Sequence, residues 1–245
     1  MTQESASTSD AGRYRSWAAT HNGTVRSVNQ DHYVNRSDLG LWAVADGAGG
    51  HQDGQVASGM IAEALEAIPP GLGAAQMLAE ARGRITATHA KLREAAAERG
   101  ADAMIASTIV VLLACDAHFA CLWAGDSRAY LLRGAGLSQL TRDHSLVQEL
   151  VEAGAITAAQ AEGHPHANVI TRAVGADAEL EIDKVTDRLR AGDRFLLCSD
   201  GLCKTLPDAE LATLLAAPDA TEKLLQAALE RSATDNVTAV VVEVS

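Results

Sequence analysis

The chain has 245 residues, of which 47% are hydrophobic and 21% charged, so it can bury a sizeable core in one large domain or two small ones; we favour one. Its formal net charge of -12 argues against a protein that binds nucleic acid or an anionic membrane surface, whereas clustered carboxylates suit cations. No apolar run could span a bilayer and no signal-peptide pattern is present, so we expect a soluble, cytoplasmic protein.

The four cysteines fit the same expectation. Cys115, Cys121, Cys198 and Cys203 lie in or beside apolar runs and form no CxxC pair. We therefore interpret them as buried, reduced thiols and not as zinc ligands or disulfides.

The first hundred residues predict a tail, short strands and two helices. Residues 1–12 are rich in Ser, Thr, Ala and acidic side chains and have no apolar period, so we expect a disordered tail before a single domain at residues 13–245. Strands are expected at residues 15–20 and 31–35, and a buried strand starts at Leu41.

Two helices should follow this buried strand. Apolar residues recur at helical spacing over residues 56–68, until a Pro-Pro-Gly run ends the pattern. Residues 74–99 are rich in Ala and charged side chains with one apolar stripe, which predicts a longer helix that Gly100 closes.

The second half of the chain begins with strands. The β-branched and apolar runs 108–115, 118–125 and 128–133 are joined by connections too short for helical crossovers, so we expect them to pair as antiparallel neighbours. Two more strands, at residues 194–199 and 237–244, enclose two helices at 208–216 and 221–232. Runs of strands and runs of helices without βαβ alternation indicate an α+β domain with antiparallel sheets covered by helices.

Residues 141–175 form an insertion between two strands. The segment is polar, carries two short helical pieces at residues 145–153 and 157–162, and is longer than a connecting loop needs to be. It could form a lid or a partner surface, and a plain surface elaboration is the alternative.

Five aspartates each follow or precede an apolar run, and four of the five lie at a strand end or start: Asp31, Asp46, Asp126, Asp200 and Asp235. Taken singly, each is explained as an ordinary turn residue. As a set they predict one edge of the sheets where their mutual repulsion needs cations, and oxygen ligands without Cys favour Mg²⁺ or Mn²⁺ over zinc. Asp46 also precedes a glycine-rich turn that lets a ligand approach the backbone.

Six runs in this order resemble the metal-dependent type 2C Ser/Thr protein phosphatases in their bacterial form. They are 26–31 (RSVNQD), 44–51 (VADGAGGH), 125–130 (GDSRAY), 140–145 (LTRDHS), 196–202 (LLCSDGL) and 235–238 (DNVT). The resemblance implies a sandwich of two antiparallel sheets flanked on both sides by α-helices, with a dinuclear Mn²⁺ or Mg²⁺ centre at one end. It also implies hydrolysis of phosphoserine and phosphothreonine in proteins by a metal-activated water, without a covalent phosphoenzyme.

The resemblance also implies residue roles. Asp46 should bridge both metals and the Gly47 carbonyl should bind one of them, while Asp200 and Asp235 complete the other. Asp31 should support the metal waters, and Asp126 with Asp200 could hold a third, looser metal. Arg26 falls where the family places its phosphate-binding arginine, a role that suits a bidentate guanidinium.

Two departures from the family pattern affect this account. Gln30 stands where the family usually has Glu, so one anionic contact to a metal water becomes neutral. Ala48 stands where the eukaryotic branch has a His that is thought to protonate the leaving group, so we expect a metal-bound water to donate that proton. His51 is near in sequence but is expected to point elsewhere.

Two other functions compete with a phosphatase. One is a catalytically inactive phosphoprotein-binding regulatory module on the same fold, which loss of Asp46, Asp200 or Asp235 would favour; all three are present. The other is a structural cation-binding domain, which leaves Arg26 and the insertion unexplained.

For the phosphatase we expect a monomer whose partners are phosphorylated proteins, including a Ser/Thr kinase or its targets, with no nucleic acid and no membrane. In the family the insertion at residues 141–175 corresponds to a mobile flap beside the metals.

Overall fold

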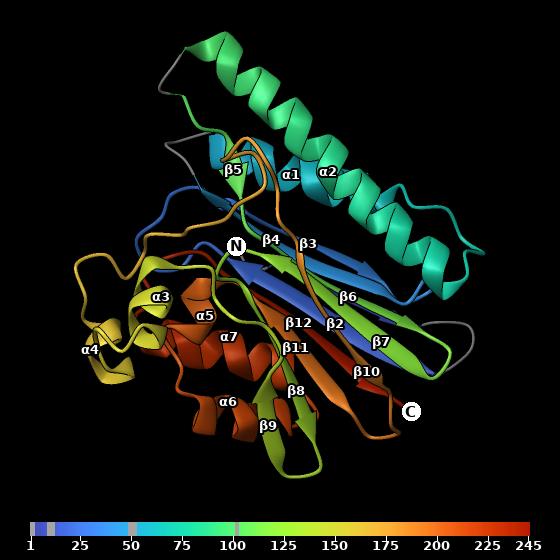
Figure 1. Cartoon of the computed structure of the whole chain (residues 1–245). Helices are drawn as coiled ribbons and strands as arrows, with labels where there is room; N and C mark the ends of the chain where they lie inside the picture. Colours follow the sequence, from blue (N-terminus) through green and yellow to red (C-terminus); the bar gives the residue numbers. More distant parts are fainter. Residues whose placement is uncertain (1–2, 9–12, 49–52, 101–102) are drawn as a thin grey trace.

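The computed structural model describes residues 3–8, 13–48, 53–100 and 103–245. Two antiparallel β-sheets lie face to face in the middle, with one group of helices outside each sheet (Figure 1). The predicted α+β class and the sandwich between helices are therefore confirmed. No helix in these ranges is long and apolar enough to cross a membrane.

The first sheet joins strands from both ends of the chain. Its order is β1-β2-β12-β11-β8-β9, and all its neighbours are antiparallel. The strands are β1 (Gln3–Thr8), β2 (Tyr14–His21), β8 (Arg128–Arg133), β9 (Gly136–Gln139), β11 (Arg194–Cys198) and β12 (Val237–Val244).

The second sheet has the order β10-β7-β6-β4-β3, and the short β5 pairs with the end of β4. The strands are β3 (Asp31–Arg36), β4 (Leu41–Ala48), β5 (Ala106–Ser107), β6 (Ile109–Cys115), β7 (His118–Ala124) and β10 (Asp183–Arg188).

Helices cover the outer face of each sheet (Figure 1). Helix α1 (Asp53–Glu66) packs on β3 and β4, and α2 (Ala74–Arg99) packs on α1. On the other side α7 (Ala220–Glu230) packs on β2 and β12, beside α5 (Asp200–Cys203) and α6 (Asp208–Leu215). The insertion carries α3 (Leu146–Glu152) and α4 (Ala158–Glu162), which lie at one end of the sandwich.

The central strands, such as β12, are apolar along most of their length because both of their faces are buried. In β12, Val237 and Val241 face the helices, whereas Val240 and Val242 face the other sheet. Between the sheets, the rings of Phe119 and Phe195 meet edge to face with centroids 4.9 Å apart. The central strands are therefore fixed by side-chain packing on both of their faces.

Two expectations about strands are wrong. Within the predicted disordered tail, Gln3–Thr8 forms β1, which pairs along β2; the backbone of an edge strand can pair without the apolar period that the prediction required. Strand β8 does not pair with β7 but with β11 in the other sheet, so only β6 and β7 are the expected neighbours.

Gly125 explains why β8 changes sheets. It has φ of +117°, which an L side chain rarely adopts, and a Cβ there would lie 2.6 Å from the Thr108 side chain. The connection from Gly125 to Ser127 thus turns the chain across the sandwich. It leaves Asp126 buried at the end where the two sheets meet.

Candidate metal centre

Asp31 and Asp46 lie opposite each other on neighbouring strands. The antiparallel register of β3 and β4 places the two residues as direct Cα partners. The Asp46 backbone is held by Thr108, the residue between β5 and β6, because its N–H donates to Thr108 Oγ1 at 3.1 Å and its carbonyl accepts from the Thr108 N–H at 2.8 Å. The sequence prediction that these two aspartates meet at one edge of a sheet is confirmed.

Asp31 connects the two sheets. Its Oδ2 accepts hydrogen bonds from Ser199 Oγ and Thr238 Oγ1, both at 2.7 Å, and both donors belong to the first sheet or the turn after it. Its Oδ1 is buried and has no protein partner within the described ranges. Burial raises the pKa of Asp31 to about 7, although the two hydroxyl donors oppose this shift.

Asp235 is paired with the predicted phosphate-binding arginine. Arg26 Nε donates to Asp235 Oδ1 and Nη2 donates to Oδ2, each at 2.9 Å, which is the bidentate geometry of a guanidinium and a carboxylate. The hydrogen bonds and charge of Asp235 raise the pKa of Arg26. The arginine side chain remains 55% exposed, so it can reach a ligand from this position.

Asn236 holds the loop that carries Arg26, and sequence reasoning did not identify it as a site residue. Its Oδ1 accepts from the Gln30 N–H at 2.8 Å, and its Nδ2 donates to the carbonyls of Asn22 and Val28, each at 3.1 Å. This buried amide therefore fixes the loop before β3 against the start of β12. The Asp-Asn order of the motif has a structural reason: the first residue faces the site and the second organises the loop.

Asp200 and Asp126 share a lysine. Lys204 Nζ donates to Asp200 Oδ2 at 2.7 Å and to Asp126 Oδ2 at 2.9 Å. Burial alone would lower the pKa of Lys204, but the two carboxylates outweigh it and raise that pKa. Lys204 was not predicted as a site residue, although its spacing of four from Asp200 placed both on one face of a helical turn.

The carboxylates influence one another electrostatically. Burial raises the pKa of Asp46 well above its ordinary value, and four further aspartates raise it again, in decreasing order Asp31, Asp200, Asp126 and Asp235. Such mutual repulsion is the condition that a divalent cation relieves. All five predicted aspartates therefore lie in one electrostatic cluster at one end of the sandwich.

The donor set suits hard divalent cations. It consists of carboxylate oxygens from both sheets, and the orphaned Asp31 Oδ1 is a buried acceptor without a protein donor. Within the described ranges no three acidic, His or Cys side chains close around one point. Arg26 and Lys204 hold three of the carboxylates, those of Asp235, Asp126 and Asp200. Asp46, Asp200 and Asp235, with Asp31 beside them, present their carboxylates at the same end of the sandwich.

Gly47 follows Asp46 where β4 meets the start of α1. A Cβ on Gly47 would lie 2.2 Å from the Gly54 carbonyl oxygen, so only glycine fits this approach. The Gly47 N–H donates to the Gln30 carbonyl at 3.1 Å. Gly49, Gly50 and His51, which complete the predicted turn, lie outside the described residues.

The insertion, which we call the flap (residues 141–175), is attached at both ends. At its start Arg128 binds Asp143 through both carboxylate oxygens, and Trp123 Nε1 donates to the Arg142 carbonyl at 2.8 Å. At its end Ser107 and Val174 exchange two backbone hydrogen bonds. The two predicted helical pieces are present as α3 and α4, and α3 has no buried residue.

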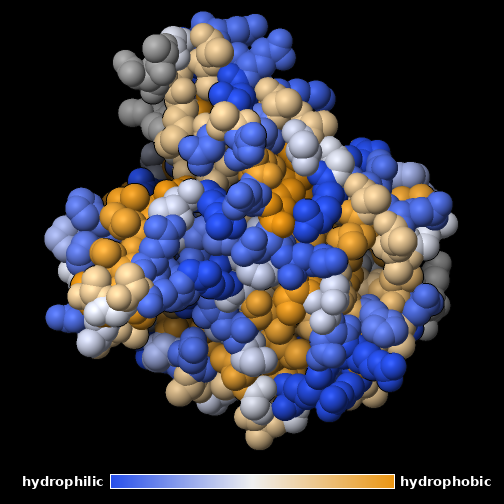
Figure 2. All heavy atoms as spheres, viewed as in Figure 1, coloured by the Kyte–Doolittle hydropathy of each residue, from blue (hydrophilic) through white to orange (hydrophobic). Residues whose placement is uncertain are grey.

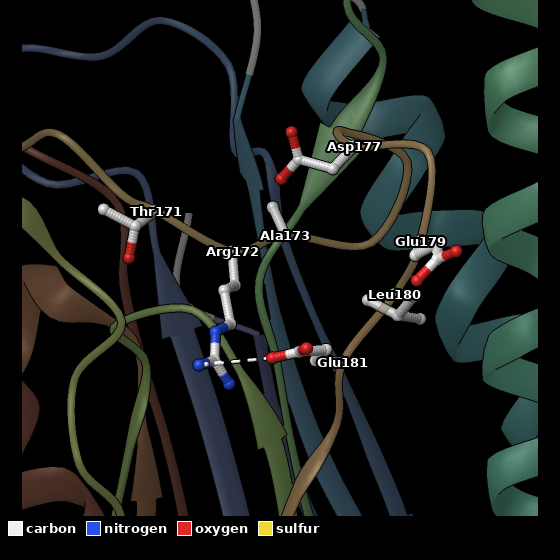
Figure 3. Close-up of a pocket in the computed structure, with 7 residues that line it drawn as sticks. All are labelled: Thr171, Arg172, Ala173, Asp177, Glu179, Leu180 and Glu181. Atoms are coloured by element: carbon white, nitrogen blue, oxygen red, sulfur yellow. Dashed lines mark ion pairs between the residues drawn. The ribbon is translucent and has the colours of Figure 1, made fainter.

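A surface pocket lies beside the end of the flap and is distinct from the carboxylate cluster. It is lined by Thr171, Arg172, Ala173, Asp177, Glu179, Leu180 and Glu181 (Figure 3). Within it Arg172 forms an ion pair with Glu181 at 3.3 Å. None of the predicted metal ligands lines this pocket. The face of the molecule seen in Figure 2 carries hydrophilic areas interspersed with apolar patches.

The fold and the site together define the class of protein. Two packed antiparallel sheets between helices carry an acidic cluster to which both sheets contribute. The model of the protein phosphatase 2C family matches residues 20–242. The chain belongs to the protein phosphatase 2C family.

Particular relatives support this placement. The chain is 35% identical over 231 residues to the serine/threonine protein phosphatase PstP of Mycobacterium tuberculosis, a match that covers 93% of this chain and 44% of PstP. The chain thus spans less than half the length of that relative.

Solved structures resemble the whole chain. The structure of PppA, described as a key regulatory component of T6SS in Pseudomonas aeruginosa, superposes with a TM-score of 0.88 at 39% identity over 99% of this chain and 100% of PppA. The catalytic domain of PstP in complex with two manganese ions superposes with a TM-score of 0.81 at 34% identity, over 95% of this chain and 98% of that domain.

Proposed function

We propose that the chain is a metal-dependent serine/threonine protein phosphatase that hydrolyses phosphoserine and phosphothreonine in proteins. The observation that carries the proposal is the cluster of Asp31, Asp46, Asp200 and Asp235, which draws on both sheets and has Arg26 at its rim. Family membership and the manganese-containing relative support the same conclusion.

Two Mn²⁺ or Mg²⁺ ions, when bound, would supply Lewis acidity and a water of lowered pKa. Asp46, Asp200 and Asp235 would hold them, and the Gly47 carbonyl would add one oxygen. Asp31 contributes through Oδ1, the only carboxylate oxygen of its side chain that Ser199 and Thr238 leave free to accept from a water.

Arg26 is proposed to bind the phosphoryl group. Its guanidinium already lies at the exposed edge of the cluster and has donors in a fork that matches phosphate oxygens. Engaging a phosphate requires it to share or release Asp235, which can occur when a metal takes over the neutralisation of that carboxylate. Ala48 offers no proton for the leaving oxygen, and a metal-bound water is the donor in this proposal.

The direct test is hydrolysis of p-nitrophenyl phosphate and of phosphoserine and phosphothreonine peptides, with Mn²⁺ and with a chelator. A phosphatase hydrolyses both types of substrate with Mn²⁺ only, and Asp46→Asn serves as the inactive control. Binding of phosphopeptides without hydrolysis at any metal concentration would instead identify the regulatory module that competes with this proposal.

Physiological context is also part of the proposal. We propose a monomeric cytoplasmic enzyme that acts on phosphorylated proteins, including a Ser/Thr kinase or its targets. The free thiols Cys115, Cys121, Cys198 and Cys203 support a reducing compartment, and the net charge of -12 argues against nucleic acid and anionic membranes as partners. A phosphoproteome compared with and without the active chain would identify these substrates.

A further inference from the structure

Lys204 occupies a position between two of the predicted metal ligands. Its ammonium group has three N–H donors and faces three oxygen atoms: Asp200 Oδ2 at 2.7 Å, Asp126 Oδ2 at 2.9 Å and Asn168 Oδ1 at 3.2 Å. All of its hydrogen-bonding capacity is therefore used. Asp126 is the most buried of the three partners, with 5% of its side chain exposed, so its charge needs a close counter-cation.

The backbone also fixes the lysine. Lys204 caps the single turn of α5, and its N–H donates to the Asp200 carbonyl at 2.8 Å. The side chain thus starts from the same helical turn as the carboxylate that it binds, at a spacing of four residues. It reaches Asp126 on the connection between β7 and β8, which are strands of different sheets.

Two carboxylate oxygens and an amide oxygen form the kind of donor set that a hard metal ion uses. Here an ammonium group already holds that set, and a metal ion at the same place would meet its positive charge and compete with its N–H donors for the same oxygens. The expected third metal at Asp126 and Asp200 does not fit this arrangement.

We propose that Lys204 replaces a third metal ion: its ammonium group neutralises Asp126 and Asp200 and ties the flap to the metal centre through Asn168. The inference rests on the proposed function, because it concerns the number of ions at the proposed centre. Asn168 is the flap residue in this contact. The lysine therefore connects the flap to Asp200, which belongs to the proposed two-metal set, and to Asp126, which does not.

The chain offers a matched control for the lysine. Lys223 also pairs with an aspartate four residues earlier, Asp219, at 2.7 Å, but this pair is on the surface of α7. Lys204→Met and Lys223→Met remove the same charge from the same kind of pair and keep a similar stem. They differ in whether the carboxylates belong to the acidic cluster.

The experiment counts bound Mn²⁺ by equilibrium dialysis and metal analysis of the whole chain, with circular dichroism to verify folding. The wild type and Lys223→Met should bind two ions, whereas Lys204→Met should bind three at the same Mn²⁺ concentration. Three ions on the wild type, or an unchanged count in Lys204→Met, would overturn the proposal. Failure of all three folded chains to bind Mn²⁺ would instead refute the metal centre itself, and the lysine proposal with it.

A second variant decides the question if Lys204→Met does not fold. If Asp126 serves the lysine and not a metal, Asp126→Asn should still bind two Mn²⁺ ions with unchanged affinities. Loss of an ion in this variant would show that Asp126 is a metal ligand in the native chain and that the proposal is wrong.

The link to the flap has its own readout. Amide hydrogen exchange over residues 141–175 should be faster in Asn168→Ala and in Lys204→Met than in the wild type, and unchanged in Lys223→Met. The Mn²⁺ count of Asn168→Ala should remain two. Equal flap exchange in Asn168→Ala and the wild type would refute the connection through Asn168.

Discussion

The acidic cluster and the flap lie side by side but are held by different kinds of contact. The cluster lies on the ends of strands whose two faces are both packed, and Asp31 is bound to the opposite sheet through Ser199 and Thr238. The flap is attached at its two ends, and its helix α3 buries no residue. The proposed chemistry would thus lie on the part of the molecule expected to open least, and the proposed contact with large substrates on a part expected to open more easily.

The largest effect should come from removing a carboxylate from the cluster. Asp46→Asn or Asp200→Asn is expected to reduce Mn²⁺-dependent hydrolysis on the order of a hundredfold or more, since several kcal/mol of charge stabilisation are lost. The fold should survive, because the apolar layers do not depend on these side chains. Steady-state rates combined with thermal unfolding in the absence of metal measure both parts. Full activity in both variants would contradict the assignment of the cluster to catalysis.

A smaller effect is expected at the rim of the cluster. Arg26→Ala should raise the Michaelis constant for a phosphopeptide, with a transition-state loss of about 1.5 to 3 kcal/mol for a charged hydrogen bond. Mn²⁺ affinity should change little, although Asp235 loses its partner in the metal-free protein. Normal phosphopeptide kinetics together with lost Mn²⁺ binding would mean that Arg26 serves Asp235 and not the phosphate.

The end of the flap should respond to pH through His89 on α2. Its Nδ1 accepts from the Gly175 N–H at 3.0 Å, and its Nε2 is buried without a protein partner in the described structure. Burial lowers the pKa of His89, so the folded state favours the neutral ring. This contribution to stability is fully present above the ordinary His pKa of about 6.5. It is lost as the pH falls from there through the lowered pKa of the folded state.

We therefore expect hydrogen exchange near Gly175 to increase, relative to its intrinsic rate, as the pH falls below about 6.5. In His89→Asn, whose amide oxygen can accept the same N–H but does not titrate, this dependence should be weaker. An identical pH dependence in both proteins would exclude His89 as its source.

The smallest effect on chemistry is expected at the exposed face of the flap. Glu149→Ala with Glu152→Ala removes two exposed charges and the ion pair between Glu152 and Arg142, which is solvated and stabilises little. Hydrolysis of p-nitrophenyl phosphate should stay within about twofold, because the exposed pair contributes well under 1 kcal/mol. Rates on different phosphoproteins should shift unequally, since only large substrates reach the flap. A proportional loss on every substrate would show that the flap serves the metal centre itself.

The bounds of several helices and strands could be predicted because they depend on residues that are neighbours in the sequence. The helix Ala74–Arg99 and the strand Val237–Val244 have the predicted bounds, since a clear apolar period and capping glycine or turn residues mark them. Pairing could not be predicted in the same way. The strand Arg128–Arg133 has the predicted bounds but pairs with β11 and not with β7, and Gln3–Thr8 pairs with β2, because pairing partners depend on contacts between segments far apart in the sequence.

The order of motifs in the sequence by itself determined the family, the fold class and the five aspartates of the site. Only the tertiary structure decided which cations accompany them: Arg26 on Asp235, and Lys204 between Asp126 and Asp200. It also showed that Asn236 organises the Arg26 loop and that Asn168 brings the flap to Lys204. The physical reason is that a motif contains residues that are neighbours in the sequence, along one strand or turn. A counter-charge can come from any segment that the packing of two sheets brings within hydrogen-bond distance.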